Sequence, residues 1–167
     1  MSNSANWANC YARQARADFS TWSFLQGNKD VNECHRLLFL QMACEKLCKA
    51  HLISEGTPPE SLQTSHGYVA KPLPVVIRNQ LLMFKATLKG TDYVLIHVRH
   101  LAQEIEILNP AVQRAGQRPD NCEYPWEDAN KAVHSPLDWT FNPTQLLLIP
   151  AGRTFLKLLE KALNAYI

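Results

Sequence analysis

Apolar side chains recur at every third or fourth position through most of the chain, which is the spacing of helices that bury one face. Residues that end helices interrupt this spacing at Gly27, Gly56, Gly90 and Asn109-Pro110. The pattern predicts helices over residues 6–25, 31–54, 75–88 and 93–108.

Particular residues mark where other helices begin. Asp30 and Glu33 have the spacing of a capping box at the start of the 31–54 helix. Asn142 before a proline predicts the start of a last helix, which is kinked or restarted at Pro150 and runs to the C-terminus. Between 57 and 74 the signals are mixed: Thr64 or Ser65 could cap a short helix over 66–70, which Pro72 and Pro74 would end.

Length and composition favour one folded unit. The 167 residues, 46% of them hydrophobic, are long enough for one core and short for two. No pair of alternating runs predicts strands that could pair with each other. We therefore expect an all-α fold, an antiparallel helical bundle of about five main helices, in a single domain over 1–167.

Residues 110–142 lack helical spacing and are punctuated by glycine and proline, so they predict an irregular extension before the last helix. Its aromatic residues include Tyr124, Trp126 and Trp139. They would either stack on a base or tether the segment to the bundle, and tethering is the more common role.

Charge and cysteine content bear on location and partners. The net charge of +2 is spread without a basic block, so bulk charge does not indicate nucleic-acid binding. No apolar run is long enough to cross a membrane, and no signal peptide is recognisable. Five cysteines without an export signal predict free thiols in a reducing compartment, so we expect a cytoplasmic protein.

Cys44, Cys48 and His51 share one stripe of a predicted helix, and all three are zinc-ligand types. The same stripe carries Leu40 and Leu47, and no short Cys-x2-Cys knuckle is present. We interpret these cysteines as core residues. The sequence predicts no metal and no cofactor.

One helix carries a family resemblance. Gln41, Glu45, Lys46, Lys49 and Ala50 follow the order Gln-x3-Glu-Lys-x2-Lys-Ala within segment 35–53. This segment resembles the second helix of the HEPN superfamily.

Other positions extend the resemblance, which is closest over residues 10–70. Asp18 matches the family's acidic position on the preceding helix, and Ser65-His66 is similar to the pair that opens the next helix. Glu123-Tyr124-Pro125 lies where many members have a similar turn. The resemblance implies a helical bundle that forms a homodimer, with the first helix in the self-associating face.

Many HEPN domains are metal-independent RNases whose Arg and His are separated by about four to six residues, the Arg for phosphate charge and the His for proton transfer. No Arg/His pair in this chain has that spacing. Arg78-Asn79 begins such a motif, but Met83, Phe84 and Lys85 occupy the places open to the His. The resemblance thus implies the fold without the expected catalytic pair.

We therefore expect a non-catalytic binding module for a nucleotide, RNA or a partner protein. His66, Lys71 and Arg78 are the candidate ligand-binding pocket, with Arg36 and Lys46 on a neighbouring face.

Two alternatives from other classes stay open. The first is a toxin or defence RNase with a displaced His, either His66 or His134, placed beside Arg78. The second is a structural partner of a nucleotidyltransferase, which predicts an exposed apolar patch in place of a polar cleft.

Overall fold

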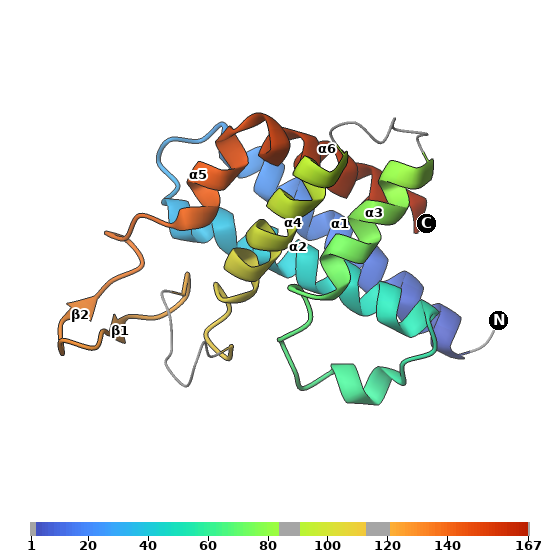
Figure 1. The fold of residues 1–167 in the computed structure, drawn as a ribbon. Helices are drawn as coiled ribbons and strands as arrows, with labels where there is room; N and C mark the ends of the chain where they lie inside the picture. Colours follow the sequence, from blue (N-terminus) through green and yellow to red (C-terminus); the bar gives the residue numbers. More distant parts are fainter. Residues whose placement is uncertain (1–2, 84–90, 113–120, 167) are drawn as a thin grey trace.

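The computed structural model describes residues 3–83, 91–112 and 121–166. Most of these residues are helical (Figure 1). The α-helices are α1 (Asn3–Gln26), α2 (Glu33–Ser54), α3 (Pro72–Met83), α4 (Thr91–Glu106), α5 (Asn142–Leu148) and α6 (Pro150–Ala165). A 3-10 turn, η1 (Pro59–Leu62), and the short strands β1 (Trp126–Glu127) and β2 (Val133–His134) complete the described elements.

The helices form an all-α bundle, as the sequence predicts. The helices α1 and α2 are paired antiparallel along their lengths, and α3, α4 and α6 pack over them (Figure 1). Phe155 of α6 and Leu40 and Leu47 of α2 are among its fully buried side chains. None of the described helices is long and apolar enough to cross a membrane.

The starts of α2 and α3 depart from the sequence prediction. The capping box is wrong, because Asn32 is the N-cap of α2 and makes no side-chain cap, while Glu33 accepts a hydrogen bond from Thr144 of α5. The helix α3 begins at Pro72, earlier than predicted, since a proline in the first turn lacks only an N–H that the helix does not use. Its predicted end lies outside the described residues.

The short helix that Thr64 or Ser65 could have capped over 66–70 does not form. The backbone N–H groups of Val69 and Ala70 donate to Oε2 of Glu106, at 2.7 and 2.8 Å. A carboxylate of α4 thus supplies the partners that a helical turn would have supplied, and the segment is irregular, with a bend at Val69 and a turn at Ala70.

The extension before α5 contains a small antiparallel hairpin that the sequence did not predict, in which Trp126 pairs with His134. Trp126, His134 and Trp139 form an aromatic cluster with ring centroids 4.9–5.8 Å apart. Trp139 also packs against the core, which supports the tethering role.

The last helix restarts at Pro150, as predicted. Leu148 ends α5, and Ile149 adopts an extended conformation before α6. A side chain at Gly152 would lie 2.7 Å from the Cα of Leu147, so only glycine allows α6 to begin this close to α5.

Candidate functional site

Glu45 is the centre of a buried polar network. Its Oε1 accepts from Lys49 Nζ at 2.8 Å and lies 3.0 Å from Nδ1 of His66, while its Oε2 accepts from Gln41 Nε2 at 2.9 Å and Asn109 Nδ2 at 3.4 Å. Each carboxylate oxygen therefore has two partners, which is what a buried charge needs to be stable.

Lys49 is almost fully buried beside that carboxylate. Its ammonium also lies 6.0 Å from the ring centroids of Tyr11 and Tyr68, within cation–π range. Lys46, the next charged residue of the resemblance, pairs with Asp18 of α1 at 2.5 Å. The residues that carry the resemblance therefore hold α1, α2 and the following loop together.

This network positions the start of α3. His66 is bound to Glu45 on α2, and Val69 and Ala70 are bound to Glu106 on α4. Lys71 directly follows Ala70, so the backbone that leads into Lys71 is held by both α2 and α4.

A cationic groove of about 610 Å³ lies between α3 and α4. Lys71 and Arg78 line it from the α3 side and Arg99 from α4, and Asp92 supplies a carboxylate. On each helix these residues are spaced by about seven positions, which is one face of a helix. Lys71, Arg78 and Arg99 form no ion pair or hydrogen bond with any described side chain.

Of the predicted ligand residues, the structure brings only Lys71 and Arg78 together. His66 does not line the groove, and Arg36 lines a different pocket, between α1, α2, α5 and α6. Lys46 is paired with Asp18 and is not among the residues that line the pocket of Arg36.

Arg99 is the groove residue that the sequence analysis missed. Arg99 lies on the exposed face of α4, a correctly predicted helix, so the helical spacing could have shown that its side chain faces solvent. What the sequence did not contain is that this face of α4 lies beside Lys71 and Arg78.

The neighbouring stripe of α4 is also exposed. Tyr93 and Ile96 are 60% and 63% accessible, one position along the helix from the groove-lining Asp92 and Leu95. Tyr93 and Ile96 thus lie on an exposed face of α4 that is about 100° around the helix from Asp92 and Leu95.

The cysteine and histidine stripe of α2 is part of the core. Cys44 and Cys48 are fully buried, and burial raises the pKa of both thiols. His51 bonds through Nδ1 to the hydroxyl of Tyr166, at 2.9 Å. Within the described ranges, no three His, Cys, Asp or Glu side chains are grouped so that they could hold a metal.

No family model matches the chain, and no curated protein or solved structure gives a significant match to it.

Proposed function

We propose that this protein is a non-catalytic binding module that holds single-stranded RNA in the α3–α4 groove. The observation that carries the proposal is the convergence of Lys71, Arg78 and Arg99 on one groove without a bonded carboxylate among the described residues. Three cations against one carboxylate, Asp92, favour an anionic ligand.

The shape of the surface favours an extended polyanion. The groove is open and runs between two helices, so a phosphate backbone could follow it. Single-strand binding surfaces combine such a basic groove with exposed rings on which bases stack, and Tyr93 supplies an exposed ring next in sequence to the groove-lining Asp92. The resemblance to the HEPN superfamily is the reason to favour RNA over DNA.

A protein partner is the competing interpretation. Leu82, Met83 and Ile96 on α3 and α4 are each more than half exposed, which suits a protein interface. Charged residues are depleted at the centres of such interfaces. Three cations in the groove, none with an ion-pair partner in the described ranges, therefore favour the phosphate ligand.

The test is fluorescence anisotropy with a labelled single-stranded RNA of about 12 nucleotides. We expect saturable binding that weakens with salt, with a log–log slope of about −2 if three phosphates are neutralised. Arg78→Gln and Arg99→Gln should each reduce the affinity and make the slope less negative by about 0.7.

Arg13→Gln is the matched control, because Arg13 is an exposed arginine of α1 outside the groove. Circular dichroism checks that each variant is folded. Absence of binding at micromolar protein, or equal losses in the groove variants and Arg13→Gln, would reject the groove as an RNA site.

A further inference from the structure

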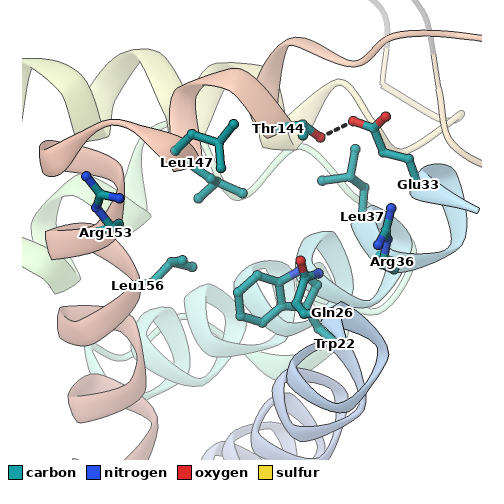
Figure 2. Close-up of a pocket in the computed structure, with 10 residues that line it drawn as sticks. Trp22, Gln26, Glu33, Arg36, Leu37, Thr144, Leu147, Arg153 and Leu156 are labelled. Atoms are coloured by element: carbon teal, nitrogen blue, oxygen red, sulfur yellow. Dashed lines mark hydrogen bonds between the residues drawn. The ribbon is translucent and has the colours of Figure 1, made fainter. Parts of the chain in front are cut away.

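A second hollow, with a volume of about 410 Å³, lies between α1, α2, α5 and α6 (Figure 2). Its walls are largely apolar, with Trp22 from α1, Leu37 from α2, Leu147 from α5 and Leu156 from α6. The volume falls within the range of about 300–1,000 Å³ that is typical of small-molecule pockets.

Two arginines lie on opposite sides of this pocket, Arg153 on α6 and Arg36 on α2 (Figure 2). Neither guanidinium forms an ion pair or hydrogen bond with a described residue. Guanidinium groups stay protonated at all relevant pH values and match carboxylates in a two-point geometry. The pocket therefore offers two guanidinium groups that can donate hydrogen bonds to an anion, beside an apolar interior.

Glu33 is the acidic residue among those lining the pocket, and it sets where an anion can sit. It lies on the Arg36 side, where it accepts a hydrogen bond from Thr144, and Arg153 lies across the pocket from it (Figure 2). An anion near Arg36 would be repelled by Glu33, whereas one at Arg153 would be farther from that charge.

The α5–α6 corner that forms one wall is held in place from two directions. Gly152 allows α6 to start against α5, and Nε2 of the buried His97 on α4 donates to the carbonyl oxygen of Leu146 at 3.0 Å. Leu147 and Arg153 are therefore carried by a fixed backbone, so little ordering of the main chain is required when a ligand binds.

We propose that this pocket binds a small amphipathic carboxylate, with its apolar body against Trp22, Leu37, Leu147 and Leu156 and its carboxylate on Arg153. The apolar walls exclude a highly charged ligand such as a nucleotide triphosphate, since its phosphates would be desolvated without enough partners. The indole N–H of Trp22 forms no hydrogen bond with the described residues, and Trp22 lines the pocket, so its signal can report on the ligand.

The probe is 4-phenylbutyrate, with 4-phenylbutyramide as its uncharged counterpart, and sodium octanoate as an aliphatic acid. Binding is followed by two-dimensional ¹⁵N NMR at the indole N–H signal of Trp22, which is assigned with the Trp22→Phe variant. We expect both acids to shift this signal saturably, and the amide to bind at least about tenfold more weakly.

Arg153→Gln should weaken binding of the acids by about tenfold or more and leave binding of the amide unchanged. Arg36→Gln should have a smaller effect, and Arg13→Gln none. No saturable shift at millimolar acid, equal affinity for acid and amide, or full retention of affinity in Arg153→Gln would overturn the proposal. RNA binding by Arg153→Gln should be unaltered, so the carboxylate pocket and the RNA groove can be rejected independently of each other.

Discussion

The imidazole of His66 is held by Glu45, whose Oε1 lies 3.0 Å from Nδ1 of His66. The carboxylate is 8% exposed and the imidazole 39%, so a loop residue is bound to a buried charge of α2. Nδ1 of His66 is therefore engaged by Glu45, and His66 forms part of the network that fixes the start of α3.

Glu45→Gln should destabilise the protein by about 3–5 kcal/mol, because it removes the negative charge that compensates the buried Lys49. Urea unfolding of the two proteins measures the difference. Glu127→Gln is the control, since Glu127 pairs with Lys131 at the surface and such pairs contribute about 0–1 kcal/mol. A similar, small loss in both variants would mean that the Glu45 network is not a stabilising centre.

Gly152→Ala should destabilise the protein by about 1–3 kcal/mol, because the added methyl group would overlap the backbone of α5. Gly27→Ala is the matched control: a Cβ at Gly27 would meet nothing within 4 Å, and we expect no destabilisation there. Thermal unfolding measures both. Equal melting temperatures for Gly152→Ala and the unmodified protein would show that α6 does not need this close approach.

Cys122 should make the protein less stable at alkaline pH. Burial raises the pKa of its thiol to about 12, whereas an unfolded thiol titrates near about 8.5–9. Between these values the unfolded chain has lost a proton that the folded protein keeps. The contribution of the protonated Cys122 thiol to the free energy of unfolding is complete below about pH 8.5. It is lost at about 1.4 kcal/mol per pH unit as the pH rises towards 12.

Urea unfolding at a series of pH values above about 8 measures this slope. Cys122→Ala should reduce it, whereas Cys10→Ser should not, because Cys10 is exposed. An unchanged slope in Cys122→Ala would contradict the assignment.

RNA cleavage above background is not expected. The sequence places no His at the required distance from Arg78, and His66 does not line the groove that contains Arg78. A positioned imidazole contributes about 10²- to 10⁴-fold to such a reaction through proton transfer. An RNase assay on mixed single-stranded substrates, beside Arg78→Ala, is the measurement.

Robust cleavage that Arg78→Ala abolishes would favour the RNase alternative. His66→Ala would then identify the proton-transfer group, with His134→Ala as the comparison. His134 is bonded through Nε2 to Asp128, and its ring packs against those of Trp126 and Trp139.

The sequence by itself determined the helices and much of the core. The apolar period placed α1, α2 and α4, and the proline at 150 placed the restart of the last helix, because these features act over a few neighbouring residues. Cys44 and Cys48 were correctly assigned to the core, since they share the apolar stripe of α2.

Only the tertiary structure decided which polar residues meet. Arg99 joins Lys71 and Arg78 in one groove, and Arg153 faces Arg36 across another, because helices distant in the sequence pack side by side. Gln41, Glu45 and Lys49 are polar and yet buried, and His66 of the loop before α3 and Asn109 after α4 both bond to Glu45. Helical spacing specifies which residues share a face, and long-range packing decides what that face contacts.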